Sequence, residues 1–382
     1  MKRLVLLGGG HSHIEVLRRF GTVPLPQMEL VLVDPGREVA YSGMLPGWIA
    51  GHYSRDECHV DLESLARFAR CCFVRSACMA IDPDARVVSC EDGSTLPYDV
   101  VSVDIGAGSP AQDTLGAALH ALPIRPVEPF VARWDELRDR TIRGQGPRTI
   151  AMVGGGAGGV EVLLAMQHRL RTLAPASDCA FHLVGDADTI LAGHNLRVQR
   201  IFSGVLDRCG VTVHLGRRVE TVENGRLHLD GGGSIDADAI VWATGATAPS
   251  WPKHSGLATD DRGFILVDTR LQSVSHPHVF AAGDVASVVD HPRPKSGVYA
   301  VRAGPPLAAN LRRVLSGQPL AEWTPQEDAL ALISTGDRYA VASRGGLALE
   351  GAWVWRWKDW IDRGFVRRYR IPSRKLEPLS QR

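Results

Sequence analysis

Residues 6–17 read LLGGGHSHIEVL, and residues 152–163 repeat the pattern as MVGGGAGGVEVL. In each copy a short apolar run leads into a glycine turn, and apolar residues at helical spacing follow the turn. Glycines let the backbone approach a pyrophosphate closely, and the start of a helix offers free N–H groups and about half a positive charge. The repeat therefore predicts two strand–turn–helix units, each able to hold a dinucleotide.

The first copy is expected to hold its dinucleotide through Gly8 and Gly10 of the turn and through His11, which opens the helix. The next apolar strand, ELVLVD, ends in Asp34, and an acid at that point can bind ribose hydroxyls. His13 stands where a third glycine usually lets helix and strand pack closely. We interpret His13 as a packing variant, with a direct contact to the cofactor as the alternative.

The second copy has glycine at all three positions of the motif, namely Gly154, Gly156 and Gly159. Its next strand, AFHLVGD, carries Gly185 where the ribose-binding acid usually stands, and no arginine sits there to favour a 2′-phosphate. We therefore expect NADH at this site, with NADPH as the alternative.

A later segment, VFAAGD, is expected to return the chain to the first unit. It is a hydrophobic strand ending in Gly283 and Asp284, and it matches the flavoprotein element whose aspartate binds the ribityl chain of FAD. An ionised carboxylate only accepts hydrogen bonds, which suits a hydroxyl ligand. Two more strand–glycine turns, VSVDIGAGSP with Gly106 and VWATGATAP with Gly245, are expected where the chain crosses between units. The first has Asp-Ile-Gly in place of Ala-Thr-Gly.

These elements predict an α/β fold in which an NAD(P)H-binding Rossmann-like domain is inserted into an FAD-binding one, with a small C-terminal region. The expected domains are residues 1–115 with 255–318 for FAD, residues 116–254 for NAD(P)H, and residues 319–382 for a C-terminal hairpin and a tryptophan- and arginine-rich helical tail. A helix is expected from about residue 296, and Gly304-Pro305-Pro306 should kink or break it.

Composition and charge narrow the class of protein. The formal net charge of +1 argues against a nucleic-acid partner. No stretch reaches the roughly 18 apolar residues of a membrane-spanning helix. The seven cysteines lack the paired spacing of a zinc site. Their odd number also does not indicate the disulfide framework of a secreted protein. We therefore expect reduced thiols, no metal and a cytoplasmic protein.

Together with YSGMLPGWIAGHYSRDECHVDL, RPKSGVYAVRAGPPLAANL and WVWRWKDWIDR, these motifs make the chain resemble two-dinucleotide-domain flavoproteins of the pyridine nucleotide-disulfide oxidoreductase superfamily. Within it, the chain is similar to type II NADH dehydrogenases and sulfide:quinone oxidoreductases, and to the flavoprotein module fused ahead of selenide, water dikinase. The resemblance implies bound FAD and NAD(P)H as donor, and it leaves the acceptor open. We expect an oxidoreductase that passes electrons to a quinone-like acceptor. A sulfur- or selenium-linked reductase is the second interpretation, and an NADH-sensing flavoprotein with little turnover is the third.

The resemblance also assigns roles to individual residues. The isoalloxazine ring would be lined by Tyr41, Ser42, Gly43, Met44 and Leu45. Glu161 matches the glutamate that relatives place near the nicotinamide, and its alternative is an acid that merely favours the helix dipole. Lys295, with Gly297 and Val298 at the start of the next helix, is expected to stabilise reduced flavin. Its alternative is a surface lysine.

The cysteine positions limit the chemistry. Disulfide reductases place a C-x(4)-C pair against the flavin, but the matching stretch, AYSGMLPG, has no cysteine. Sulfide:quinone enzymes use a late cysteine pair, and no cysteine follows Cys209. Cys58 alone lies in the segment expected near the flavin, and we interpret it as a buried structural thiol, with a redox role as the alternative.

Residues 353–370, WVWRWKDWIDRGFVRRYR, combine tryptophans and arginines at helical spacing. Tryptophan with arginine is typical of a membrane interface, where a lipid-soluble quinone would be reached. The alternative is a helix packed on the FAD domain or on a homodimer partner. The sequence favours neither interpretation.

Overall fold

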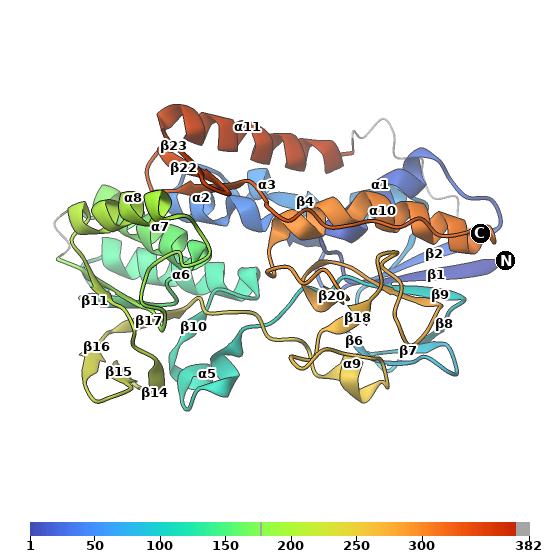
Figure 1. The fold of residues 1–382 in the computed structure, drawn as a ribbon, viewed down its shortest axis with the longest axis horizontal. Helices are drawn as coiled ribbons and strands as arrows, with labels where there is room; N and C mark the ends of the chain where they lie inside the picture. The colour runs from blue at the N-terminus through green and yellow to red at the C-terminus, as the bar shows by residue number, and fades with distance from the viewer. Residues whose placement is uncertain (176–177, 372–382) are drawn as a thin grey trace.

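The computed structural model describes residues 1–175 and 178–371 and contains a five-stranded parallel sheet in each half of the molecule (Figure 1). The first sheet has the order β19-β9-β1-β2-β5, and the second has the order β10-β17-β11-β12-β13. The first comprises β1 Lys2–Leu7, β2 Met28–Val33, β5 Cys72–Val74, β9 Val100–Val103 and β19 Val279–Ala281. The second comprises β10 Leu122–Pro123, β11 Thr149–Val153, β12 Ala180–Val184, β13 Val211–His214 and β17 Ala239–Trp242.

Strand β19 lies beyond the whole second sheet in the sequence, yet it joins the first sheet beside β9. The strands of the second sheet are thus inserted between two parts of the first. This topology confirms the predicted α/β fold with two Rossmann-like units. The residue bounds expected for the three domains stay predictions.

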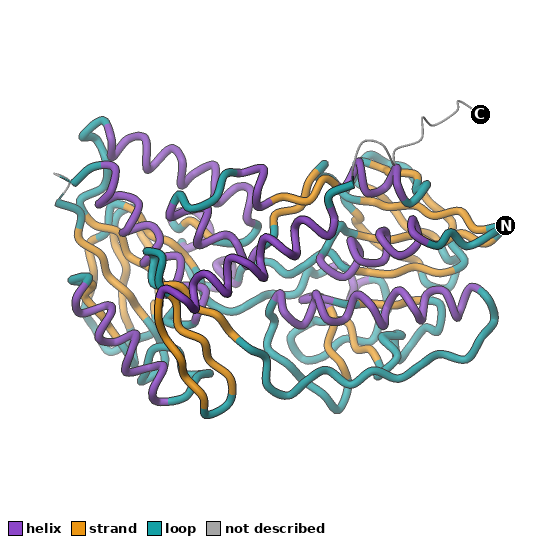
Figure 2. Tube along the Cα trace, turned by 90° about the horizontal axis from the view of Figure 1, so that it is seen from above, coloured by secondary structure: helices purple, strands orange, loops and turns teal. Residues whose placement is uncertain are grey.

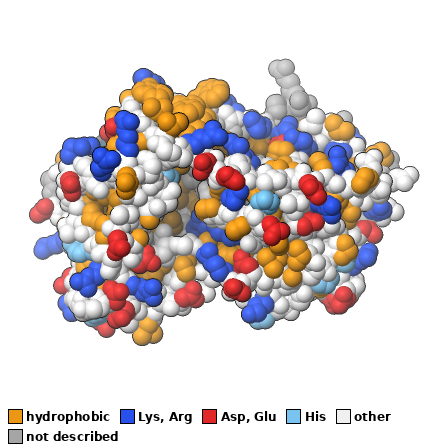
Figure 3. Space-filling model, in the orientation of Figure 1, with side chains coloured by type: hydrophobic (Ala, Val, Ile, Leu, Met, Phe, Trp, Pro, Cys, Tyr) orange, Lys and Arg blue, Asp and Glu red, His pale blue; other side chains and the backbone are white. Residues whose placement is uncertain are grey.

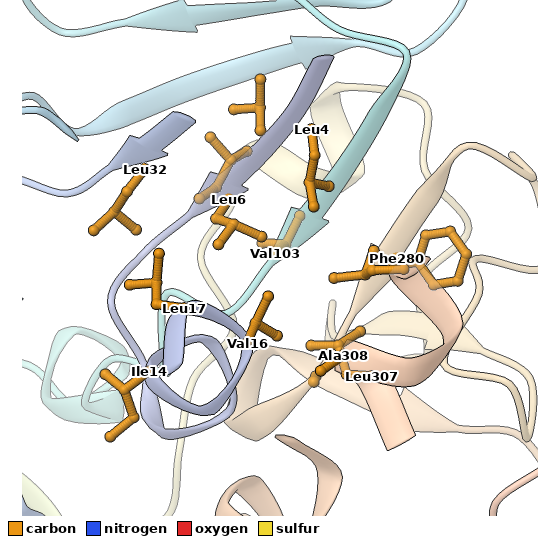
Figure 4. Packing of buried hydrophobic residues seen from close by; sticks show 14 of the residues in the cluster. Leu4, Leu6, Ile14, Val16, Leu17, Leu32, Val103, Phe280, Leu307 and Ala308 are labelled. Carbon is orange, nitrogen blue, oxygen red and sulfur yellow. The ribbon is translucent and has the colours of Figure 1, made fainter. Parts of the chain in front are cut away.

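Layers on both faces explain why the strands of the first sheet are mostly apolar. Helices α1 (His11–Thr22) and α10 (Gly297–Leu315) cover one face, and Figure 4 shows Leu17 and Leu307 of these helices beside the sheet. Ile81 and Val88 belong to the same core and come from an antiparallel sheet of β6 (Cys78–Asp82), β7 (Val87–Cys90) and β8 (Thr95–Pro97). A parallel strand buried on both faces needs apolar residues at every position.

Shorter elements complete the two halves. The small sheets comprise β3 Glu38–Ala40 with β4 His59–Asp61; β6 Cys78–Asp82, β7 Val87–Cys90 and β8 Thr95–Pro97; β14 Val219–Glu223, β15 Arg226–Leu229 and β16 Ser234–Asp236; and β18 Ile265–Val267 with β20 Ala286–Val288. The helices comprise α2 Leu45–Ala50, α3 Arg55–Cys58, α4 Leu62–Phe68, α5 Ala117–His120, α6 Val127–Ile142, α7 Ala157–Leu173, α8 Leu196–Arg208 and α9 Trp251–His254, with 3₁₀ turns η1 Ser42–Met44, η2 Pro110–Asp113 and η3 Gly283–Val285.

The C-terminal region is an antiparallel sheet followed by helix α11 (Ala352–Tyr369), which extends from the second half towards the first (Figures 1 and 2). The sheet has three strands, β21 Ala331–Ser334, β22 Ala340–Arg344 and β23 Leu347–Gly351. The expectation of a two-strand hairpin was therefore wrong by one strand. Val354 packs on the C-terminal sheet, whereas Phe365 and Val366 belong to the core of the first half.

Helix α10 continues through Gly304, Pro305 and Pro306, so the expected break there was wrong, and the alternative of a kink stays a prediction. The side chains of Leu307 and Leu311 are fully buried, and this tertiary packing compensates for the backbone hydrogen bonds that proline cannot donate. Gly304 allows the close approach, because a Cβ at this position would lie 2.8 Å from the Cβ of Glu15 on α1.

Two helix glycines give a matched test of this contact. We expect Gly304→Ala to lower the free energy of unfolding by about 1–2 kcal/mol, because overpacking outweighs the gain in helix propensity. Gly364→Ala in α11 meets no atom within 4 Å, so it should raise that free energy by up to about 1 kcal/mol. Urea unfolding of both variants measures the difference. Two changes of the same sign would contradict the close contact between α1 and α10.

Candidate active site

Three glycine turns meet at the carboxyl ends of β1, β9 and β19. Gly8 has a φ of +89°, and a Cβ there would lie 2.5 Å from the carbonyl oxygen of Asp104. The N–H of Gly10 donates to the same oxygen at 3.2 Å. Gly283 has a φ of +71°, and its Cβ would lie 2.2 Å from Oδ1 of Asp104. Only glycine fits such approaches, and ligands of open parallel sheets bind at these strand ends.

His11, the first residue of α1, offers an unpartnered nitrogen at this place. Among the described residues, its buried Nε2 has no hydrogen-bond partner. The ring stacks on Phe365 at 5.8 Å between centroids and lies 5.4 Å from the ring of Tyr41. Burial lowers the pKa of His11 to about 4, so the ring is neutral. An orphaned buried nitrogen at a helix N-terminus fits a phosphate or hydroxyl ligand, as FAD would provide.

His13 is turned into the fold instead. Its Nδ1 lies 2.6 Å from the carbonyl oxygen of Gly8, and its Nε2 lies 2.8 Å from Oγ of Ser102. Burial lowers the pKa of His13 to about 4. Because both ring nitrogens are engaged between helix and sheet, the structure favours the packing interpretation over a side-chain contact with the cofactor.

Asp34 lies beside the first glycine turn, at the end of β2. Its Oδ2 accepts the N–H of Gly9 at 2.6 Å, and its Oδ1 accepts the N–H of Gly36 at 2.7 Å. Burial raises the pKa of Asp34, against the effect of these two donors. The carboxylate thus shapes the turn itself, and its contact with a ribose stays a prediction.

Asp284 forms an ion pair with Arg125, a residue that the sequence analysis did not identify. Nη1 of Arg125, which follows β10 in the second half, donates to Oδ2 of Asp284 at 3.1 Å. The pair joins the predicted ribityl position to the other half of the molecule. The available signal was a basic residue two positions after a strand, in the stretch LPIRP, but its partner lies 159 residues away.

The residues expected to line the flavin lie at the boundary between the halves. A Cβ on Gly297, which opens α10 just before Val298, would lie 3.1 Å from Oγ of Ser42. Met44 is buried in the core of the first half, and Leu45 in the core of the second. The start of α10 and the η1 turn therefore lie next to each other. This is consistent with the expectation that both segments contact the flavin, which stays a prediction.

Lys295 is engaged by protein groups. Its Nζ donates to the carbonyl oxygen of Ala286 at 2.5 Å and lies 3.9 Å from the ring centroid of Phe264. Burial lowers the pKa of Lys295 to about 8. These contacts exclude a free surface lysine and favour a role in holding the segment before α10. A catalytic role for Lys295 stays a prediction.

The second glycine turn repeats the crowding of the first. Gly154 has a φ of +125°, and its Cβ would lie 2.7 Å from the carbonyl group of Ala243 at the end of β17. A Cβ on Gly159 would lie 2.0 Å from the carbonyl oxygen of Gly154. Gly156 caps α7 with open space around it. Gly106 and Gly245 end the matching turns of the two halves, with φ values of +75° and +25°.

Glu161 reaches from α7 to the C-terminal sheet. Its Oε1 accepts the N–H of Ser334 at 2.7 Å and the hydroxyl of Ser334 at 3.0 Å. Burial raises the pKa of Glu161, while the nearby ammonium of Lys358 opposes this shift. Glu161 is therefore part of a polar network, which a simple helix-dipole residue would not require.

Lys358 of α11 is the centre of that network, and sequence reasoning missed it. Its Nζ donates to the carbonyl oxygen of Gly43 at 2.7 Å and to Oδ2 of Asp362 at 2.8 Å. Burial lowers the pKa of Lys358, but the carboxylates of Asp362 and Glu161 together raise it by more. The signal was the single lysine of a tryptophan–arginine stretch, with an aspartate four residues later.

Helix α11 also presents apolar side chains to solvent. Trp353 is 48% exposed and Trp360 is 67% exposed, and Leu347 and Leu349 of β23, the strand that leads directly into α11, are exposed as well. Figure 3 shows hydrophobic and basic side chains together at this edge, and a hollow between the two halves. Within residues 1–175 and 178–371, no helix has the length and apolar character that crossing a bilayer requires.

The only thiol expected near the flavin is buried. Cys58 ends α3, and burial raises its pKa to about 12. A thiol in that environment stays protonated at neutral pH and is a poor nucleophile. The structure therefore favours the structural interpretation of Cys58.

Comparisons with known proteins agree with this geometry. A sequence profile described as "Pyridine nucleotide-disulphide oxidoreductase" matches residues 2–304. The chain is 23% identical to the NADH dehydrogenase-like protein YutJ of Bacillus subtilis, over 85% of this chain and 87% of that protein. It is 21% identical to the type II NADH:quinone oxidoreductase of Staphylococcus saprophyticus, over 84% and 85% of the two chains.

A solved structure shares the fold over nearly the whole chain. The sulfide:quinone oxidoreductase of Aquifex aeolicus superposes with a TM-score of 0.82 at 17% sequence identity. The match covers 98% of this chain and 94% of that chain. The likeness shows the fold. The resemblance to the module fused ahead of selenide, water dikinase stays a prediction.

The buried ammonium of Lys358 gives a stability test. We expect Lys358→Gln to lower the free energy of unfolding by about 3 kcal/mol, because Asp362 and Glu161 would lose their shared cation. Arg356→Gln, two residues earlier on the exposed face, should change it by less than about 0.5 kcal/mol. Urea unfolding compares them. The double variant Lys358→Gln/Asp362→Asn should recover part of the loss, and equal effects of the two single variants would contradict the network.

Proposed function

The chain belongs to the pyridine nucleotide-disulphide oxidoreductase family, and on this premise we propose that it oxidises NADH with bound FAD and passes the electrons to a quinone. The observation that carries the proposal is the position of the Lys358 ammonium, which donates to the carbonyl oxygen of Gly43 and interacts electrostatically with the carboxylate of Glu161. Glu161 follows the second dinucleotide turn, and Gly43 belongs to the segment expected at the flavin. Hydride transfer needs the two reacting atoms about 3–3.5 Å apart, and an ammonium that interacts with both segments supports neighbouring positions for the two rings.

The residues present fit the two nucleotides. FAD, when bound, supplies the hydride acceptor and the relay to the final acceptor. We expect Gly8, Gly10 and His11 to hold its pyrophosphate, and Asp34 and Asp284 to accept from its hydroxyls. The turn at Gly154, Gly156 and Gly159 would hold the pyrophosphate of NADH, with its nicotinamide beside Glu161. The glycine crowding and the orphaned nitrogen of His11 support these assignments.

The network around Lys358 holds one ammonium, paired with the carboxylate of Asp362, at a fixed position beside the η1 turn. Its ammonium lies against the carbonyl group of Gly43, so it can stabilise negative charge that develops beside the η1 turn. Glu161, kept near the ammonium and bonded to Ser334, would orient the carboxamide of the nicotinamide. A preorganised charge of this kind needs no rearrangement when electrons arrive.

A sulfur- or selenium-linked reductase gains less support. That chemistry commonly uses reactive thiols, whereas the only thiol expected near the flavin has a pKa raised to about 12. A redox-sensing flavoprotein differs from an enzyme in turnover alone. Steady-state NADH oxidation with a soluble quinone therefore separates these two functions.

The edge formed by Leu347, Leu349, Trp353 and Trp360 is proposed to contact a membrane surface peripherally, where a quinone is reached. Exposed tryptophans beside Arg356 suit the interface between headgroups and acyl chains. The opposite side of α11 packs inside the protein. The same helix can therefore pack on the FAD domain with one side and contact a membrane with the other. A homodimer contact through the same edge is the other outcome to test.

An anaerobic absorbance titration tests the donor. We expect near-stoichiometric NADH to bleach the flavin band, with NADPH less effective. Glu161→Gln should keep its FAD but lower kcat/KM for NADH by about 10- to 100-fold, because it loses a fixed charge at the nicotinamide. Glu136→Gln, on the exposed side of α6, is the control. If neither nucleotide bleaches a flavin that dithionite reduces, the second turn is not a donor site.

Liposome co-sedimentation tests the membrane contact. We expect the double variant Trp353→Ser/Trp360→Ser to bind anionic liposomes at least about tenfold more weakly, because two large apolar side chains no longer insert. Leu119→Ser on α5 removes a side chain that is 80% exposed elsewhere and should leave binding unchanged. Unchanged liposome binding by the tryptophan variant, together with a shift from dimer to monomer, would assign the edge to a homodimer instead.

A further inference from the structure

The two halves build the same turn with one chemical difference. The N–H of Asp104 donates to Leu7 at 2.8 Å in the first half, and the N–H of Ala243 donates to Val153 at 2.7 Å in the second. Gly8 is crowded by the backbone at Asp104 in the way that Gly154 is crowded at Ala243. The second turn forms without a carboxylate, so the carboxylate of Asp104 is not needed to make such a turn.

The carboxylate binds the start of α1. Oδ2 of Asp104 accepts the N–H of Ser12 at 2.8 Å and the N–H of His13 at 3.0 Å. Its Oδ1 faces Gly283, where no Cβ could fit. Asp104 is only 2% exposed. One side chain of β9 therefore binds the β1–α1 turn and packs closely against the β19 turn, at the place where FAD is expected to bind.

The surroundings of Asp104 are poor in positive charge. The carboxylate of Asp284, in the β19 turn, repels the carboxylate of Asp104. The guanidinium of Arg125 is paired with Asp284. The rings of His11 and His13 on α1 are neutral, and Asp34 on β2 adds a second acid at the same turn. Burial, the largest cause, raises the pKa of Asp104 to about 7 despite the two N–H donors.

We propose that Asp104 is a positioning residue of the FAD site, which locks the three glycine turns together and takes up one proton from solvent when FAD binds. The pyrophosphate brings two negative charges to the turn that already holds this buried carboxylate, and protonation removes the repulsion. The inference rests on the FAD-binding part of the proposed function and is independent of the electron acceptor.

The pH dependence follows from linkage. Below about pH 7 Asp104 is protonated with or without FAD, so affinity is highest and constant there. Above that pH the free site is ionised while the complex keeps its proton, so the Kd for FAD should rise about tenfold per pH unit. The loss continues until the pH passes the higher pKa of the complex.

The first experiment uses the full-length wild-type protein. FAD binding is measured between pH 6 and 9 by flavin fluorescence, and by calorimetry in two buffers with different ionisation enthalpies. We expect uptake of about one proton near pH 8 and the rise in Kd above pH 7. Tight binding without proton uptake would overturn the inference alone. Absence of FAD binding at every pH would overturn the proposed function as well.

Variants identify the residue. Asp104→Asn keeps an oxygen that accepts from Ser12 and His13 but cannot ionise, so its Kd should be flat across this range and about tenfold lower than wild type at pH 8. Asp99→Asn is the matched control, because Asp99 also accepts a backbone N–H, at the other end of β9 and exposed. A wild-type slope in Asp104→Asn would overturn the inference. If that variant does not fold, the wild-type proton count decides.

Discussion

Backbone crowding at the carboxyl ends of two parallel sheets is the constraint on which this structure depends. Gly8 and Gly154 both have positive φ and lie against the end of a neighbouring strand, where any Cβ would overlap a carbonyl group. With side chains excluded from the turns, the chain passes at the strand ends directly into the N-termini of α1 and α7, where the helix dipole favours phosphate. The buried strands and covering helices serve to hold these two turns in place.

A buried cation, Lys358, interacts with residues from both halves of the molecule. Lys358 comes from the C-terminal helix, and its partners come from η1, from α7 and from α11 itself. A buried ammonium is stable only when carbonyl and carboxylate groups surround it. This requirement ties the first half, the second half and the C-terminal region to one point, and that point lies beside the η1 turn.

The halves are alike in backbone and unlike in charge. Each half has a glycine turn after its first strand. Each also has one position after the next strand that holds either an acid or a glycine, and a further strand that ends in a glycine turn. The first half carries Asp34 and Asp104 at positions where the second carries Gly185 and Ala243. Topology is thus shared, while the electrostatics of each site is individual. The fold alone does not determine how each half holds its nucleotide.

The sequence by itself determined the α/β class, the two glycine turns, and the placing of Asp34 and Asp284 at strand ends. These features are local, because glycine conformations and apolar strands depend on neighbours in the chain. Reasoning of this kind failed at Gly304-Pro305-Pro306, where packing on α1 keeps α10 continuous. It also left the orientation of His13 open, because the ring's partner Ser102 lies 89 residues away.

Only the tertiary structure decided which side chains share the site. Lys358 meets Gly43 across 315 residues, and Arg125 meets Asp284 across 159. No periodicity or motif records such pairs, because they arise when separate elements pack and a buried charge must find its counterpart. The same holds for α11, whose buried face is set by contact with η1 and α1. The local pattern specified the two nucleotide turns, and long-range packing brought them together.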